Sequence, residues 1–168
     1  MFFYKETSRL ILRSPKSEDA LDFAQKRSSP FVLKYNLYSP CDKERVLSEF
    51  ENNFSILIIL KETNTLIGEV RIKDDGFRFH TNSKELQFWL TEDCARQGYM
   101  TETLNFIIDF LFSSGKADKI AVRVFSENVA SCKLVEKLGF NKEGYLKNAI
   151  KNYDGKIFDL VCYVLENG

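Results

Sequence analysis

The stretch Ala95-Arg96-Gln97-Gly98-Tyr99-Met100-Thr101-Glu102 separates a strand-like run at residues 84–91 from a long segment with a helical pattern. Apolar residues in that segment recur with the α-helical period, at Leu104, Ile107, Ile108, Leu111 and Phe112. Gly98 opens this helix, and a glycine at a strand-to-helix turn lets the backbone approach a ligand closely. The helix start presents amide groups and the positive end of the helix dipole, which suit a phosphate. Because Arg96 adds a positive charge, the sequence predicts an anion site here.

The length of 168 residues predicts a single domain covering residues 1–168, and the order of strand and helix patterns predicts an α/β (α+β) architecture. Strand patterns at 84–91 and 119–125 flank the long helix, and a helical connection of this length favours a parallel pair. Asp74-Asp75-Gly76 is typical of a β-hairpin, and the stretch between Pro30 and Pro40 is expected to be irregular. Further helices are expected at residues 17–27, after an Asp42 cap, and from Asn128 to Gly139. Further strands are expected at 9–13, 54–61, 66–73, 143–150 and 156–165.

Composition excludes several classes of protein. The chain is 44% hydrophobic and 29% charged, as expected for a folded globular domain. Its net charge is zero and no basic tract occurs, so nothing favours nucleic-acid binding. The longest aliphatic run, at residues 56–60, is too short to cross a membrane. Because no export signal is recognised, we expect a cytoplasmic protein with four free cysteines and no metal site.

A second informative stretch reads Asn128-Val129-Ala130-Ser131-Cys132-Lys133-Leu134-Val135-Glu136-Lys137-Leu138-Gly139-Phe140. Taken alone it is an ordinary capped amphipathic helix with a glycine stop, just as Gly98 alone is a common helix start. In this order, however, the two stretches resemble the GCN5-related N-acetyltransferase (GNAT) superfamily, in particular its branch of ribosomal-protein N-terminal acetyltransferases. Residues 97–103 resemble the first motif of that branch. Asn128, Ser131 and residues 134–140 resemble the second.

The resemblance extends over nearly the whole chain. The run Arg9-Leu10-Ile11-Leu12-Arg13 resembles the opening strand of that branch, while Ile67-Gly68 and Phe88-Trp89-Leu90 resemble its central strands. Within the first motif, Ala95 stands where the superfamily has Arg or Gln, Arg96 where this branch often has Gly, and Met100 in a slot for a small residue. Such loops bind pyrophosphate largely through backbone amides, which these changes leave in place.

The resemblance implies a GNAT fold. This is a mixed, mostly antiparallel twisted sheet of six to seven strands, with about four helices and a V-shaped splay between the two middle parallel strands. Acetyl-coenzyme A would be the co-substrate in that splay, and no metal is implied. Its pyrophosphate would rest on Arg96, Gln97, Gly98, Tyr99, Met100 and Thr101. Its pantetheine arm would contact the backbone of Trp89, Leu90 and Thr91, and also Asn128 and Ser131.

The resemblance also implies direct acetyl transfer to an amine in a ternary complex. Glu85, on the cofactor strand, is the first expected base and Glu69, on the neighbouring strand, is the second, although either can be an ordinary strand residue. The Leu90 amide is expected to stabilise the oxyanion. Many superfamily members protonate the leaving thiolate with a Tyr, but Val135 stands at that position. Ser131 or water is therefore expected to serve instead.

Several alternatives remain open from the sequence. The acceptor is either a protein N-terminal α-amine or a small-molecule amine, with Tyr35, Tyr38 and Tyr153 expected near it. The chain can be a monomer or a homodimer. A different class of function is a non-catalytic module that binds coenzyme A or acetyl-coenzyme A for regulation. A nucleotide-binding domain of another kind is disfavoured, because the sequence has neither a Gly-Lys-Ser/Thr loop nor Gly-x-Gly-x-x-Gly.

Overall fold

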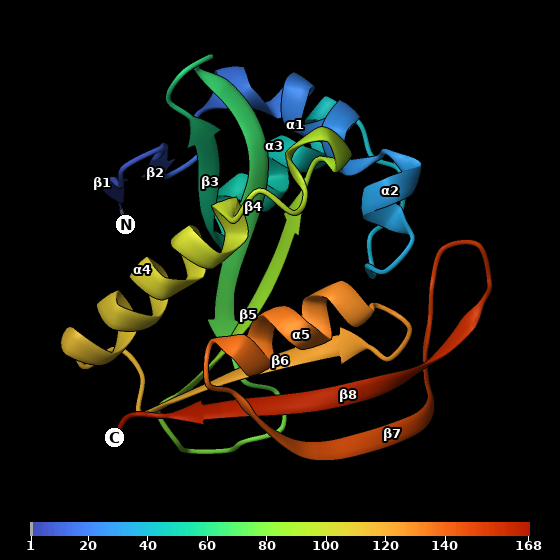
Figure 1. Ribbon diagram of the computed structural model, residues 1–168. Helices are drawn as coiled ribbons and strands as arrows, with labels where there is room; N and C mark the ends of the chain where they lie inside the picture. Colours follow the sequence, from blue (N-terminus) through green and yellow to red (C-terminus); the bar gives the residue numbers. More distant parts are fainter. Residues whose placement is uncertain (1) are drawn as a thin grey trace.

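The computed structural model describes residues 2–168, which form one eight-stranded sheet with helices on both faces (Figure 1). The strands are β1 Tyr4–Glu6, β2 Leu10–Arg13, β3 Phe54–Leu60, β4 Thr65–Asp74, β5 Ser83–Leu90, β6 Lys119–Phe125, β7 Asn141–Lys151 and β8 Ile157–Glu166. Their order is β1-β2-β3-β4-β5-β6-β8-β7, and every pair is antiparallel except β5 with β6. The predicted mixed, mostly antiparallel sheet is confirmed. The sheet has one strand more than the six to seven expected, because β1 pairs with β2. The sequence did not predict β1, since this strand is short and exposed and has no apolar alternation.

The described residues contain five α-helices: α1 Ala20–Arg27, α2 Pro30–Leu33, α3 Lys43–Asn52, α4 Tyr99–Ser113 and α5 Val129–Lys137. Short 3₁₀ turns at Ser17–Asp19 and Glu92–Cys94 precede α1 and α4. The sequence predicted about four helices and an irregular stretch after Pro30. Instead, Ser29 caps α2 by accepting a hydrogen bond from the Val32 amide, and Pro30 occupies the first helical position.

The helices cover opposite faces of the sheet (Figure 1). One face packs against α4 and α5, where Leu104 and Ile107 join sheet residues such as Leu86 in the main core. The other face packs against α1 and α3, where Phe23 meets Trp89 edge-on at 5.3 Å between ring centroids. Leu86 and Trp89, which point to opposite faces of β5, therefore contribute to different cores, as the alternation of side chains along a strand requires.

The two parallel strands separate after a short paired section. Pairing runs from Ser83 with Lys119 to Leu86 with Val122. Beyond that point β5 stays paired with β4 and β6 stays paired with β8, so the facing edges of β5 and β6 diverge (Figure 1). This is the V-shaped splay that the family resemblance implied.

The connection between β4 and β5 is longer than the predicted hairpin. The strands pair out to Asp74 with Lys84, and residues 75–82 form the link between them. The Asp75 carboxylate organises this link by accepting hydrogen bonds from the Phe77 amide and the Ser83 hydroxyl, and by pairing with Arg78 and Arg123. Asp75 of the Asp-Gly sequence is therefore a buried ion-pair partner, and the sequence does not form a two-residue turn.

Three features of residues 2–168 concern membranes, metals and thiols. No helix among residues 2–168 is long and apolar enough to cross a membrane. Within the same residues, no three His, Cys, Asp or Glu side chains gather as a metal site would require. The cysteines at positions 41, 94, 132 and 162 are free thiols, as expected.

Candidate active site

The loop before α4 holds a backbone conformation that suits a bound anion. Arg96 and Gly98 both adopt the left-handed region, with φ of 64° and 82°. Gly98 is the N-cap of α4, and the Glu102 amide donates to its carbonyl at 3.0 Å. The amides of residues 99–101 therefore lie outside the helical hydrogen-bond ladder, at the positive end of the helix. Free amides at the positive end of a helix suit a phosphate.

A cavity of about 350 Å³ occupies the splay between β5 and β6. Its walls come from residues 85–88 of β5, residues 122–125 of β6, the start of α5 and the segment that follows α2. It brings together five residues that the sequence pointed to, namely Tyr35, Tyr38, Glu85, Asn128 and Ser131. Tyr153, which was also expected near the acceptor, lies instead on the exposed link between β7 and β8.

The start of α5 contributes two polar side chains to this cavity. Asn128 caps the helix as predicted, because its Oδ1 accepts a hydrogen bond from the Ser131 amide at 3.2 Å. This bond anchors the Asn128 side chain to the first turn of α5, and both Asn128 and Ser131 line the cavity.

The edge of β5 that faces the splay carries backbone groups from alternate residues. The Thr91 amide donates to the Ile67 carbonyl of β4 at 2.8 Å, and the Thr91 carbonyl accepts from the Cys94 amide at 3.2 Å. Because backbone groups point to alternate sides along a strand, the amides of Leu90 and Phe88 point toward β6. The sequence named Trp89, Leu90 and Thr91 as backbone contacts. The strand geometry instead makes Leu90 and Phe88 available to a ligand.

The sequence of residues 9–141 matches the family model of the acetyltransferase (GNAT) domain. This chain belongs to the GNAT family. The uncharacterised N-acetyltransferase p20 of Bacillus licheniformis is 30% identical to it, over 95% of this chain and 93% of p20. The ribosomal-protein-S5-alanine acetyltransferase of Vibrio fischeri shares the fold, with a TM-score of 0.84, 23% identity and coverage of 98% and 97%. The microcin C7 self-immunity acetyltransferase MccE, solved with acetyl-CoA and AMP, gives a TM-score of 0.83 at 17% identity, with coverage of 96% and 94%.

Membership of the family confirms the two main expectations from the sequence. The fold is that of the GNAT superfamily, and the protein is an enzyme of the N-acetyltransferase class. The two motifs that carried the resemblance lie where the geometry is suitable: the first at the start of α4, the second at the cavity wall.

Of the two carboxylates predicted as bases in this acetyltransferase, Glu85 lines the cavity. Its Oε1 lies 3.2 Å from Lys73 Nζ and accepts a hydrogen bond from Gln87 at 3.2 Å, while its Oε2 pairs with Arg123. Arg123 also pairs with the buried Asp75. Both oxygens of Glu85 are therefore engaged by neighbouring side chains.

Glu69 lies elsewhere, fully buried beneath α1 and α3. It accepts hydrogen bonds from the Ser55 hydroxyl at 2.6 Å and from the Trp89 indole at 3.0 Å, and it pairs with Arg71. Trp89 pairs with Glu69 across β4 and β5, so its ring belongs to the core rather than to the splay. The structure thus separates the two predicted bases.

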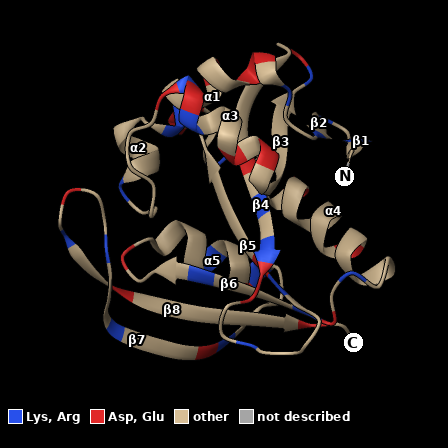
Figure 2. Ribbon diagram, turned by 180° about the vertical axis from the view of Figure 1, so that it is seen from behind, with Lys and Arg blue, Asp and Glu red and all other residues tan. Residues whose placement is uncertain are grey.

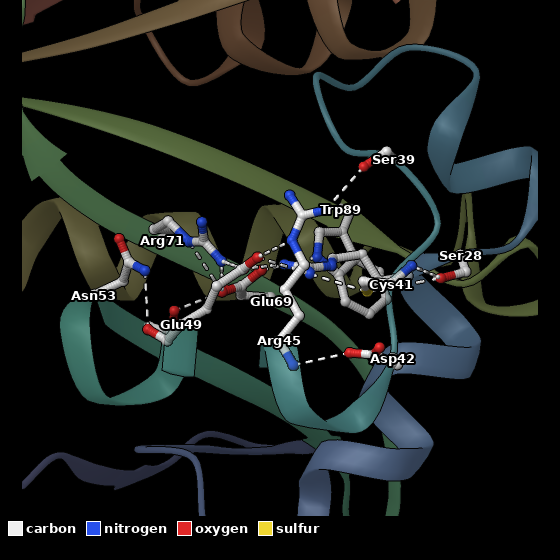
Figure 3. A network of polar contacts seen from close by, with 12 residues as sticks. Ser28, Ser39, Cys41, Asp42, Arg45, Glu49, Asn53, Glu69, Arg71 and Trp89 are labelled. Atoms are coloured by element: carbon white, nitrogen blue, oxygen red, sulfur yellow. Dashed lines mark hydrogen bonds and ion pairs between the residues drawn. The ribbon is translucent and has the colours of Figure 1, made fainter. Parts of the chain in front are cut away.

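A charged network joins α1, α3 and β4 (Figure 3), next to Tyr38, which lines the cavity. Glu49 of α3 joins Arg27 of α1 at 2.5 Å and Arg71 of β4 at 3.0 Å. Tyr38 lies beside both guanidinium groups, with its ring centre 4.8 Å from Cζ of Arg27 and 5.6 Å from Cζ of Arg71. Burial alone would raise the pKa of Glu49, but the hydrogen bonds from both arginines lower it to about 2. Sequence patterns missed this network because its members come from three separate elements.

Proposed function

We propose that this acetyltransferase transfers the acetyl group of acetyl-coenzyme A directly to an α-amine. The observation that carries the proposal is the cavity in the splay, because it joins the free edge of β5 to a recess beside Tyr35 and Tyr38. A donor can lie along the strand edge while an acceptor enters from the side of the two tyrosines. Holding both substrates in one cavity supplies the proximity that direct transfer in a ternary complex needs.

Acetyl-coenzyme A would be bound mainly by backbone groups. We assign its pyrophosphate to residues 96–101, where the helix amides and the left-handed loop favour an anion. Its pantetheine arm would pair with the backbone of Phe88 and Leu90 as an added strand. Asn128 and Ser131 would lie close to the thioester, since both line the cavity.

The transfer forms one bond and breaks another. The neutral amine attacks the thioester carbonyl, the carbon–sulfur bond then breaks, and the amine loses one proton as the thiolate leaves. We propose Glu85 as the proton acceptor through water, because it is the predicted base that lines the cavity. The Leu90 amide, which points into the splay, is the proposed donor to the oxyanion.

The charges around the cavity favour an acceptor amine that loses its proton easily. Three charged side chains are found among the described residues that line it: Lys73, Arg123 and Glu85. Because Arg123 also pairs with the buried Asp75, these side chains leave no excess negative charge that would attract a polyamine. Figure 2 likewise shows Asp and Glu positions interspersed with Lys and Arg positions along the ribbon on the side of α1 and α3. An α-amine has a pKa of about 7.7–8.0, against about 10.4 for a lysine side chain, so it needs less help from Glu85.

The leaving thiolate needs little assistance from the protein. Val135, at the position of the usual Tyr, is buried in the main core and offers no proton. A thiol has a pKa of about 8.5, so the thiolate is already a good leaving group at neutral pH. The Ser131 hydroxyl, at the cavity wall, is the proposed partner for the sulfur.

We propose a protein or peptide N-terminus as the acceptor to test first, with small-molecule α-amines second. The recess beside Tyr35 is lined by aromatic and aliphatic side chains, which can receive the first residues of a peptide. The fold likeness to the ribosomal-protein-S5-alanine acetyltransferase agrees with this choice. A cytoplasmic acceptor also agrees with the four free thiols, which persist in reducing compartments.

Calorimetric titration with acetyl-coenzyme A, using ATP as the control ligand, tests the proposed cofactor. The proposal expects binding of acetyl-coenzyme A and none of ATP. Preferential binding of ATP would contradict it. Binding of acetyl-coenzyme A without turnover on any free α-amine would instead favour the regulatory coenzyme A module.

A further inference from the structure

The turn between β1 and β2 is attached to the first turn of α4 through one carboxylate. Glu102 Oε1 accepts hydrogen bonds from the Thr7 hydroxyl at 2.5 Å, the Ser8 hydroxyl at 3.0 Å and the Arg9 amide at 3.1 Å. Its Oε2 pairs with Arg9 Nε at 2.7 Å. Four donors from three consecutive residues thus converge on one side chain of α4, which fixes the position of the turn against the helix.

Arg9 continues from Glu102 to the loop that precedes α4. Its Nη1 donates to the Gln97 carbonyl at 2.8 Å, and its guanidinium lies 4.5 Å from the centre of the Tyr99 ring. Its Nη2 lies close to Gly98, at 3.3 Å from where a Cβ on that residue would stand. The arginine therefore touches three successive residues of the loop assigned to pyrophosphate.

From these contacts we propose that Arg9 and Glu102 act as positioning residues, which lock residues 96–98 in the conformation that binds the phosphates of coenzyme A. The inference rests on the proposed function, because it assumes that coenzyme A binds at this loop. It adds Arg9, which lies outside the first motif and the cavity, and it gives a role to Glu102, which belongs to that motif but was not assigned to the pyrophosphate.

Two physical effects support a lock. The left-handed backbone of Arg96 is unfavourable for a residue with a side chain, so external contacts are needed to maintain it. The hydrogen bond from Arg9 to the Gln97 carbonyl and the contact with Tyr99 hold the backbone on both sides of Gly98. In addition, Arg9 neutralises the Glu102 carboxylate, which would otherwise oppose a phosphate at the start of the helix.

The competing explanation is that the Arg9 guanidinium itself forms an ion pair with a phosphate of coenzyme A. Two substitutions distinguish the two explanations. Glu102→Gln removes the carboxylate without changing the size of the side chain and leaves Arg9 positively charged. A lock predicts weaker binding in this variant, whereas a direct charge contact predicts equal or tighter binding. Arg9→Lys keeps the charge but loses the planar group that reaches both Glu102 and Gln97.

The experiment is calorimetric titration of coenzyme A into the wild-type protein and the variants Arg9→Ala, Arg9→Lys and Glu102→Gln. We expect Kd to rise about tenfold in each variant, as for the loss of a charge-assisted contact. We also expect KM for acetyl-coenzyme A to rise while KM for the acceptor amine is unchanged. This split would not follow from a general loss of structure.

Arg13→Ala is the matched control, because Arg13 lies at the other end of β2 and also pairs with a carboxylate, that of Asp19, at 2.7 Å. We expect it to lower the melting temperature and to leave Kd within about twofold of the wild type. Wild-type affinity in Glu102→Gln, or full rescue in Arg9→Lys, would overturn the lock. If the wild-type protein did not bind coenzyme A at all, the proposed function would fail first, and the lock with it.

Discussion

Gly68 of β4 lies against the Trp89 carbonyl of β5 so closely that a Cβ at position 68 would overlap that oxygen. The same Cβ would lie 2.8 Å from the Leu90 side chain and 3.2 Å from its Cα. This contact occurs where β5 has separated from β6 but is still paired with β4, next to the backbone that we assign to the pantetheine arm.

Gly68→Ala should therefore displace β5 at residues 89 and 90. We expect a loss of about 1–3 kcal/mol in the free energy of unfolding, as for an overpacked site, and weaker binding of acetyl-coenzyme A. Gly144→Ala is the control, because a Cβ there would meet its nearest neighbour, Cys162, at an ordinary 3.8 Å. Denaturant unfolding and calorimetry measure both effects. Similar results for the two variants would show that the close approach at Gly68 has no special role.

Gly98→Glu should abolish coenzyme A binding, because the new side chain blocks the loop and its charge repels the phosphates. Gly115→Glu, at the far end of α4, provides the control, since Gly115 also has a positive φ, of 65°. Both variants should lose about 1–2 kcal/mol of stability from backbone strain. Calorimetry should then find coenzyme A binding in Gly115→Glu alone, and unchanged affinity in Gly98→Glu would mean that the loop is misassigned.

Ser131→Ala should lower kcat more than it raises KM for acetyl-coenzyme A. We expect at least about a tenfold decrease in kcat if the hydroxyl assists the departing sulfur. Steady-state kinetics on an α-amine acceptor provide the measurement, with Ser114→Ala at the end of α4 as the control. Equal turnover in Ser131→Ala and the wild type would remove Ser131 from the chemistry.

Glu85→Gln tests the proposed proton acceptor. We expect kcat/KM to fall about tenfold with an α-amine and further with a lysine-type amine, which depends more on a base. Glu69→Gln should mainly lower stability, because Glu69 is buried against Trp89 and Ser55. If Glu85→Gln has full activity at neutral pH, the proton leaves by another route.

Glu49→Gln should destabilise the protein by about 3 kcal/mol at neutral pH, since it leaves Arg27 buried without its carboxylate partner. The pKa of Glu49 falls from 4.5 to about 2 on folding, so its contribution is complete above pH 4.5 and disappears toward pH 2. Unfolding curves of the two proteins should therefore converge as the pH falls through this range. A constant difference between them would exclude ionisation of Glu49 as the cause.

Local patterns were sufficient for most of the fold. The helical period after Gly98, the Asn128 cap and the long connection between the parallel strands each depend on nearby residues, so each was predicted. Failures occurred where distant residues decide the outcome. Asp75 looked like part of a turn, but Arg123 of β6 turns it into a buried ion-pair partner.

The candidate site was predicted less completely, for the same reason. The sequence placed Glu85 and Glu69 on neighbouring strands, but only the packing of Trp89 reveals that Glu69 is enclosed. The hydrogen bond from the Thr91 amide to Ile67 of β4 was needed to show that the amides of Phe88 and Leu90 are the ones that face the splay. The contact between Arg9 and Glu102 joins residues that are 93 positions apart. No local pattern could have signalled it.

The most direct test of the central claim uses two peptides of one sequence in equal amounts with acetyl-coenzyme A. One peptide has a free N-terminus and a blocked lysine, and the other has a blocked N-terminus and a free lysine. Mass spectrometry identifies which peptide gains an acetyl group in the presence of the protein. The account predicts acetylation of the free N-terminus, with little on the lysine. Preferential acetylation of the lysine side chain, or none on either peptide or on free α-amino acids, would contradict it.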